Sequence, residues 1–96
     1  MVRNYETIYI LKPDLEEEVR EQLQERITGI INDNQGEILE TEVWGTKRLA
    51  YEVKDFTSGF YTMINFKGES DLVNELERNY KIIDDVIRYL TIKQED

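Results

Sequence analysis

Two adjacent basic residues, Lys47 and Arg48, are the side chains whose types and spacing best suit a chemical task in this chain. The arginine guanidinium is a planar fork of donors and the lysine ammonium is a mobile point charge, so the pair can bind phosphate groups or base edges. The same pair also suits a solvated strand edge that charge protects against aggregation. Taken alone the pair favours that surface role, and an anionic partner is the alternative hypothesis.

Catalytic residues of the usual kinds are scarce. The chain has no cysteine and no histidine, which excludes zinc sites built from them, thiol nucleophiles and histidine general bases. Carboxylates do cluster, at Glu16–Glu18 and at Asp84–Asp85. Acids, however, collect at helix N-termini through the helix dipole and on solvated faces. We therefore expect no catalysis, no metal site and no cofactor.

The overall charge is acidic, whereas the extended segments carry the bases. Twelve lysines and arginines stand against 21 acids, a formal net charge of −9, which argues against a protein that coats nucleic acid by bulk electrostatics. The acids concentrate in stretches with helical periodicity. The bases in or beside extended stretches are Arg3, Lys47, Arg48, Lys54, Arg88 and Lys93. A nucleic acid must therefore approach the strands or loops rather than the helices.

The length and composition fit one globular domain over residues 1–96. Its 96 residues are 40% hydrophobic, which suffices for a single core without disulfides. The N-terminal stretch lacks an apolar signal segment, and no apolar run approaches the roughly 20 residues needed to cross a bilayer. We expect a cytosolic protein that makes no membrane contact.

Four segments have the composition of strands, with β-branched and aromatic residues closed off by turn residues. They span residues 5–11, 37–54, 60–66 and 86–92. The second is the longest, and we expect it to bend at Gly45, because a glycine has no side chain to pack and usually marks a bulge or bend. A five-residue loop containing a glycine, residues 55–59, should join it to the third.

Two amphipathic helices separate these strands. In the first, apolar residues recur at spacings of mostly four. We expect Asp14 to cap it, with Glu17 completing a capping box, and Gly36 to end it in a left-handed conformation. The second should begin at a cap within residues 68–71. Residues 94–96 should form a frayed polar tail.

This element order folds most simply into an α+β sandwich of the ferredoxin-like βαββαβ type. Its sheet has four antiparallel strands, with both helices on one face. The first and third strands should be central, and both carry apolar residues on both faces. The face without helices should therefore expose apolar side chains, which predicts a partner-binding surface. Its candidate residues are Ile8, Ile10, Trp44, Tyr61, Met63, Leu90 and Ile92.

Base stacking is the weaker alternative for that face. Tyr61 and Met63 resemble the aromatic platform of RNA-recognition motifs, which share this topology. The signature sequence of those modules is absent from the chain, so protein contact is the expected use of the face. Trp44 can stack on a base, anchor a protein partner or simply pack at a strand end.

Four motifs resemble the bacterial ribosomal small-subunit protein six family, and together they span essentially the whole chain. They are RNYETIYILKP (Arg3–Pro13), WGTKRLAYEV (Trp44–Val53), GFY (Gly59–Tyr61) and KIIDDVIRYL (Lys81–Leu90). The element G-x-[KR]-R-L-A-Y, followed at this separation by D-x-V-I-R, is the specific part of the resemblance.

The resemblance implies a ferredoxin-like fold, no catalysis and a structural role in the central domain of the small ribosomal subunit. Members of the family bind small-subunit ribosomal RNA as a heterodimer with ribosomal small-subunit protein eighteen, a small basic protein. Such a partner can neutralise phosphates that an acidic chain cannot. The candidate RNA contacts carried over are Arg3, Lys47, Arg48, Lys54 and Arg88. A different class stays open, a ferredoxin-like regulatory domain that pairs edge to edge with itself and binds a small molecule.

Overall fold

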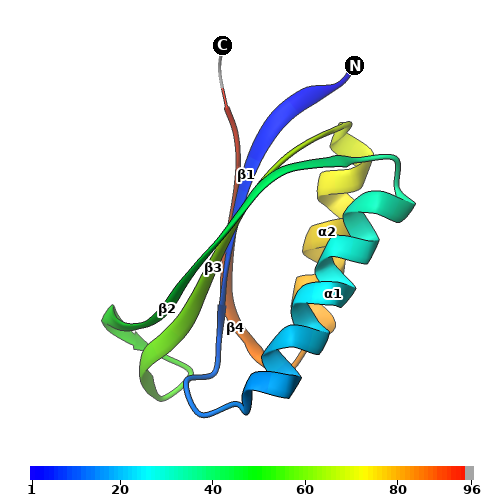
Figure 1. The fold of residues 1–96 in the computed structure, drawn as a ribbon. Coiled ribbons are helices and arrows are strands. Elements are labelled where there is room, and N and C mark those ends of the chain that lie inside the picture. The colour runs from blue at the N-terminus through cyan, green and yellow to red at the C-terminus, as the bar shows by residue number, and fades with distance from the viewer. Residues whose placement is uncertain (95–96) are drawn as a thin grey trace.

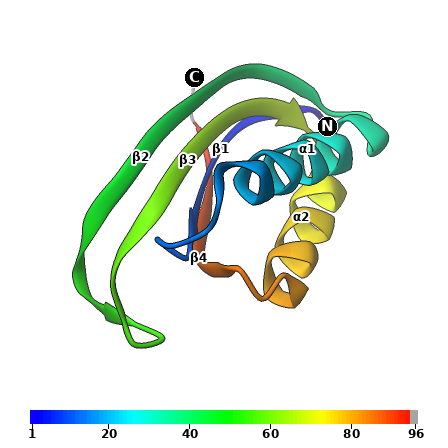
Figure 2. The same ribbon diagram turned by 60° about the horizontal axis from the view of Figure 1, so that its bottom comes forward.

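A computed structural model describes residues 1–94 and contains one four-stranded antiparallel sheet with two helices against one face (Figures 1 and 2). The elements are β1 (Arg3–Leu11), α1 (Glu17–Asp33), β2 (Glu37–Val53), β3 (Phe56–Gly68), α2 (Ser70–Ile82) and β4 (Val86–Lys93). The strand order β2-β3-β1-β4 makes β1 and β3 central. The predicted α+β fold and its two central strands are therefore confirmed.

The hydrophobic core lies between the sheet and the helices. β1 contributes alternate side chains from Tyr5 to Leu11, and β3 contributes Ile64 and Phe66. The buried helix residues that pack against them are Ile27, Ile31, Leu72, Leu76 and Tyr80. Because side chains alternate along a strand, the even-numbered residues of β1 point away from the helices. We call this opposite side of the sheet the uncovered face.

The ends of α1 differ from the prediction. Asp14 lies in the preceding turn, and the helix begins at Glu17 without a side-chain hydrogen bond at its cap, so the predicted capping box is wrong. Gln35 rather than Gly36 takes the left-handed conformation, with φ 64°. Gly36 is needed for space instead, since a Cβ there would lie 2.6 Å from Leu72 Cδ2.

β2 and β3 form a long hairpin with a tight turn. β2 is continuous over Glu37–Val53, and Gly45 bends it at a bulge with φ 84°, as predicted. The predicted five-residue loop is wrong, because β3 already begins at Phe56. Lys54 and Asp55 alone make the turn, with φ 50° and 69°. A turn with two positive φ values usually contains Asn or Gly. Because this one is Lys-Asp, it could not be predicted from the sequence.

The hairpin curves strongly toward its tip (Figure 2), and its side chains contact one end of the uncovered face. Leu49 is buried there against Ile10 and Ile87. The Tyr51 hydroxyl accepts a hydrogen bond from Arg88 Nη1 on β4 at 2.7 Å. Because β2 and β4 are the two opposite edges of the sheet, these two long side chains span the width of the sheet. We call residues 49–53 the roof.

The C-terminal residue of the described chain is held in place. The backbone N–H of Gln94 donates to the carbonyl of Asn4 at 2.8 Å. Glu95 and Asp96, which complete the tail predicted to fray, lie outside the described residues. Within residues 1–94, neither helix is long and apolar enough to cross a membrane.

Candidate nucleic-acid and partner interface

The uncovered face is a grid whose rows run across the four strands. A short row at the N-terminal end of β1 pairs Glu37, Lys67 and Asn4. Beyond it, and going from β2 to β4, the first full row is Glu40, Asn65, Glu6 and Ile92. The second row is Glu42, Met63, Ile8 and Leu90, and the third is Gly45, Tyr61, Ile10 and Arg88. Beyond the third row, Lys47 pairs with Gly59. We call rows one and two the acidic half, and row three with the hairpin residues beyond it the basic half.

An apolar strip runs along β1 and β4 in the acidic half. Leu90 and Ile92 are 55% and 45% exposed, and Ile8, paired with Leu90, is half-buried. The expected exposure is wrong for two candidates, since Ile10 is 6% and Met63 4% exposed. The roof covers Ile10, and Met63 sits on a central strand with neighbours on both sides. Ile8, Leu90 and Ile92 are therefore the partner-binding candidates accessible in this half.

Three carboxylates flank the strip and have only neutral hydrogen-bond donors. Glu6 accepts from Gln94 at 3.5 Å, Glu40 from Asn65 at 3.2 Å and Glu42 from Trp44 at 3.1 Å. None of the three forms a salt bridge with another residue of the described chain. Negative charge beside exposed apolar carbon is complementary to a basic protein surface.

The basic half begins with an aromatic stack. Trp44, which is 38% exposed, stacks on Tyr61 with ring centres 6.4 Å apart. Lys47 Nζ lies 4.9 Å from the centre of the Trp44 ring. Arg48 is exposed next to it in the chain, and the alternation along β2 directs its side chain to the other face of the hairpin. Within residues 1–94, neither Lys47 nor Arg48 is neutralised by a salt bridge. Both charges are available to an anionic ligand.

A hollow of 220 Å³ lies between the roof and the sheet. Its lining residues are Ile8, Ile10, Leu49, Ala50, Tyr51, Tyr61, Arg88, Tyr89 and Leu90. The Arg88 guanidinium is 5.3 Å from the centre of the Tyr51 ring, in addition to its hydrogen bond with that hydroxyl. The lining is apolar and aromatic with one positive charge and no carboxylate.

The remaining predicted RNA-binding residues lie at opposite ends of the molecule. Lys54 is in the hairpin turn, close to Asp84. The hydrogen bond and charge of Lys12 lower the pKa of Asp84, and the charge of Lys54 adds to this effect. Arg3 begins β1, where it pairs with Gly68. The structure thus gathers four of the five candidates at the basic half and leaves Arg3 apart.

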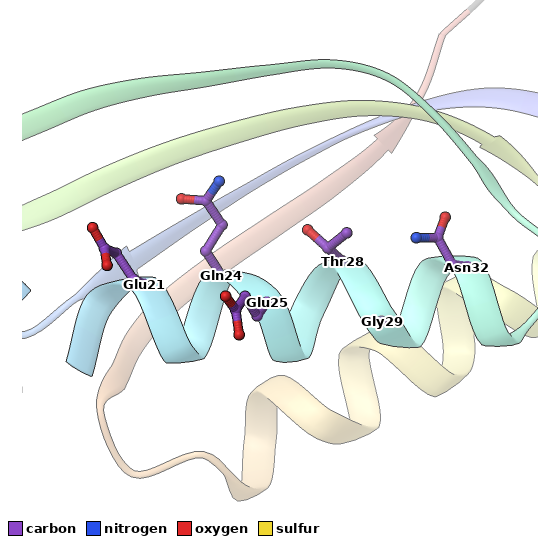
Figure 3. Close-up of a pocket in the computed structure, with 6 residues that line it drawn as sticks. All are labelled: Glu21, Gln24, Glu25, Thr28, Gly29 and Asn32. Atoms are coloured by element: carbon purple, nitrogen blue, oxygen red, sulfur yellow. The ribbon is translucent and has the colours of Figure 1, made fainter. Parts of the chain in front are cut away.

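A second concavity runs along α1, on the helical side of the molecule (Figure 3). Its 570 Å³ are lined by α1 alone, through Glu21, Gln24, Glu25, Thr28, Gly29 and Asn32. Figure 3 shows these side chains projecting from successive turns of the one helix. Among the described residues, no group of three acids is placed to hold a metal ion. The carboxylates of this groove repel phosphate, so a nucleic acid is expected on the other side of the sheet.

Comparison with known proteins gives a consistent result. The family model described as ribosomal protein S6 matches residues 4–93. The crystal structure of 30S ribosomal protein S6 from Thermotoga maritima has a TM-score of 0.92 and 37% sequence identity, over 98% of this chain and 89% of that one. The P2 domain of the chemotaxis kinase CheA, solved with the response regulator CheY from the same organism, has a TM-score of 0.59. At 12% identity over 98% of this chain and all of that one, it shares the fold alone.

Proposed function

This chain belongs to the ribosomal protein S6 family, and from that premise we propose that it binds small-subunit ribosomal RNA jointly with ribosomal small-subunit protein eighteen. As a member it is a structural protein of the small ribosomal subunit, located with the ribosome in the cytoplasm. Joint binding would help to assemble the central domain of that subunit. The family match favours this role over a self-pairing regulatory domain that binds a small molecule.

The separation of charge on the uncovered face is the observation that carries the proposal. A chain of net charge −9 repels RNA as a whole. Its acidic half, however, can hold a basic protein, while Lys47, Arg48, Lys54 and Arg88 gather at the hairpin end of the sheet. The partner then neutralises phosphates that this chain cannot reach, and the two proteins present one positive surface to the RNA.

The acidic half is the proposed partner site. The partner covers Leu90, Ile92 and the exposed part of Ile8, since burial of apolar area is worth about 25 cal/mol per Å². Its lysines and arginines pair with the carboxylates of the first two rows, which steers association and fixes the orientation. Trp44 and Tyr61 lie where the halves meet and extend the contact. Ile10 and Met63 are buried, so they pack beneath the exposed residues of the site and do not contact the partner themselves.

The basic half is the proposed RNA site. Lys47, Arg48, Lys54 and Arg88 contact phosphate oxygens, and Arg3 makes a separate contact at the opposite end of β1. Phosphate contacts of this kind position a protein on RNA without reading its sequence. The salt dependence of RNA binding should therefore contain a contribution from these residues.

Filter binding tests the proposal with a central-domain fragment of small-subunit ribosomal RNA. The RNA is titrated with this chain, with protein eighteen and with both together, at several salt concentrations. We expect the pair to bind more tightly, and with a steeper salt dependence, than protein eighteen alone. An unchanged affinity of protein eighteen on addition of this chain would contradict joint binding.

A further inference from the structure

We infer that the hollow under the roof binds one unpaired nucleobase of an RNA strand whose phosphates lie on Lys47 and Arg48. The inference rests on the proposed RNA binding and adds to it the kind of RNA that the basic half takes, a single-stranded or bulged segment. Neither the family match nor the predicted phosphate contacts assign a ligand to this hollow.

The size and the lining of the hollow suit a single flat ring system. Its 220 Å³ is below the roughly 300 Å³ at which pockets for drug-sized ligands begin. Ile10 and Leu49 line it with apolar side chains, and Tyr51 and Tyr61 line it with aromatic rings. Trp44 stacks on one face of Tyr61 and Arg88 lies over one face of Tyr51, which leaves the second face of each ring for a base. Every nucleobase has a π-face that can stack on such rings, whatever the sequence of the strand.

The charge around the hollow favours a nucleotide over a side chain of a basic protein. Arg88 lines the hollow, no carboxylate does, and Lys47 and Arg48 immediately precede the roof residue Leu49 in the chain. A lysine or arginine of a partner would meet like charge there. A nucleotide instead combines an uncharged flat base with an anionic phosphate, the same combination that this end of the sheet complements.

Arg88 has donors to spare for such a ligand. Its guanidinium carries five N–H donors, and the one hydrogen bond it makes among residues 1–94 goes from Nη1 to the Tyr51 hydroxyl. This bond holds the guanidinium beside the Tyr51 ring, with its other donors available to a base edge or a phosphate. A base entering the hollow would therefore contact an aromatic ring and a fixed arginine at the same time.

This geometry also explains why base stacking is hard to see in the sequence. RNA-recognition motifs stack bases on aromatic residues of their central strands. In this chain the central positions Ile8, Ile10 and Met63 are not aromatic, and Tyr61 already stacks on Trp44, whereas the ring of Tyr51 reaches the hollow from the edge strand β2. The stacking residue thus comes from the roof rather than from the sheet.

The test compares two single-stranded RNA octamers of equal charge, one of adenylates and one of abasic ribose phosphates. Each is titrated into the full chain at low salt, and the amide resonances of residues 49–51 and 88–90 are followed by NMR. We expect the octaadenylate to bind about 5- to 100-fold more tightly than the abasic strand, as for the stacking of one base. Equal affinity of the two strands would overturn the inference.

Two variants of one residue provide the matched control. Tyr51→Leu removes the aromatic ring and should abolish the preference for octaadenylate, whereas Tyr51→Phe keeps the ring and should retain most of it. Tyr51 is exposed, so both variants should unfold at nearly the wild-type temperature, which thermal melts verify. A Tyr51→Leu protein that keeps the full preference would also overturn the inference.

The outcome separates this inference from the proposed function. If joint binding of ribosomal RNA holds but the octamers bind equally, the base site fails and the proposed function stands. If protein eighteen without RNA shifts the amide resonances of the roof residues 49–51, the hollow is a protein site and the inference is overturned. Failure of joint binding, scored in the separate filter assay, would remove the proposed function itself.

Discussion

The two halves of the uncovered face are built on the same four strands. They differ in the sign of their exposed charges and in how far the hairpin covers the sheet. In the acidic half the apolar strip is accessible, and Glu6, Glu40 and Glu42 form no salt bridge with the described residues. In the basic half the edge strand is bent at Gly45, and Leu49 of the hairpin packs over Ile10. Its cations Lys47, Arg48, Lys54 and Arg88 outnumber its carboxylates Glu52 and Asp55, and none of the six forms a salt bridge among residues 1–94. An acidic chain can thus offer RNA a positive end without becoming basic overall.

The difference predicts that the halves respond separately to substitution. Sites further apart than about 7–10 Å without shared partners usually contribute additively to stability and binding. A change in one half should therefore alter one binding partner and spare the other.

Met63→Glu should cause the largest loss, in stability rather than in binding. Met63 lies within the acidic half but is 4% exposed, so the substitution buries a charge without a partner, at a cost of about 3–5 kcal/mol. Urea unfolding measures this loss. A loss below about 1 kcal/mol would show that Met63 is part of the accessible strip, and would redraw the boundary of the partner site.

High pH should lower the free energy of unfolding through two tyrosines that are buried between the sheet and the helices, away from both halves of the uncovered face. Burial raises the pKa of the Tyr9 hydroxyl to about 12, and burial also raises the pKa of Tyr80. The folded state holds these hydroxyls neutral, whereas in the unfolded chain they ionise near pH 10. Their contribution to the free energy of unfolding is therefore complete below pH 10 and is lost as the pH rises toward 12. For Tyr9 it amounts to about 2–3 kcal/mol.

Urea unfolding between pH 9 and pH 12 tests this expectation. Tyr9→Phe should flatten the dependence of unfolding free energy on pH, whereas Tyr51→Phe, in the exposed roof, should leave it steep. Equal slopes for wild type and Tyr9→Phe would show that Tyr9 does not titrate with folding.

Lys47→Glu combined with Arg48→Glu should lower the RNA affinity of the protein pair by about 10- to 100-fold, and reduce the slope of log affinity against log salt by about 2. Association with protein eighteen in the absence of RNA should not change, since both residues lie in the basic half. The same filter assay measures the first effect and calorimetry the second. Lys81→Glu, an exposed position on α2, is the control. An unchanged salt slope would remove the basic half from the RNA site.

Leu90→Glu should weaken association with protein eighteen by about tenfold while leaving the unfolding free energy nearly unchanged. Leu90 is 55% exposed, so the charge stays in water in the free protein but must be desolvated in the complex. Calorimetry and thermal melts measure the two quantities. Ile82→Glu, at an exposed apolar position on α2, should bind like wild type. Weakening by both variants would argue for a general effect of charge rather than for a site.

The fold was predictable because its signals are local and agree with one another. Helical periodicity, strand composition and the crossover rule together define the element order and the sheet, and the lack of a side chain at Gly45 marks the bend. The alternation along β1 also sorts its side chains onto two faces, although it does not show which face the helices cover. These features depend on neighbouring residues in the chain.

The candidate site was predictable only in part. It depends on the register between β2 and β3 and on a contact between the two edge strands β2 and β4. Bulges near Leu39 and Trp44 interrupt the alternation of β2. Without the first bulge, Glu40 and Glu42 would share the helical side with Ile38. The gathering of carboxylates opposite Asn65 and Met63 is therefore invisible in the sequence.

The position of the roof could not be predicted from the sequence for a similar reason. The contact between Tyr51 and Arg88 joins opposite edges of the sheet, and it requires the Lys54–Asp55 turn, which lacks glycine and asparagine. Ile10 is buried because Leu49 of the same roof packs against it. The nearest signal in the sequence is the alternation of Leu49, Tyr51 and Val53, which predicts one shared face but not what that face covers.

Methyl and amide NMR of the labelled chain, with protein eighteen added first and the RNA fragment second, tests the division of the uncovered face most directly. We predict that protein eighteen shifts the methyl signals of Ile8, Leu90 and Ile92, and that RNA then shifts the amides of Lys47 and Arg48. Resonances of α1 should not move in either step. Shifts from both partners at the same half of the face, or at α1, would contradict the separation of the two sites.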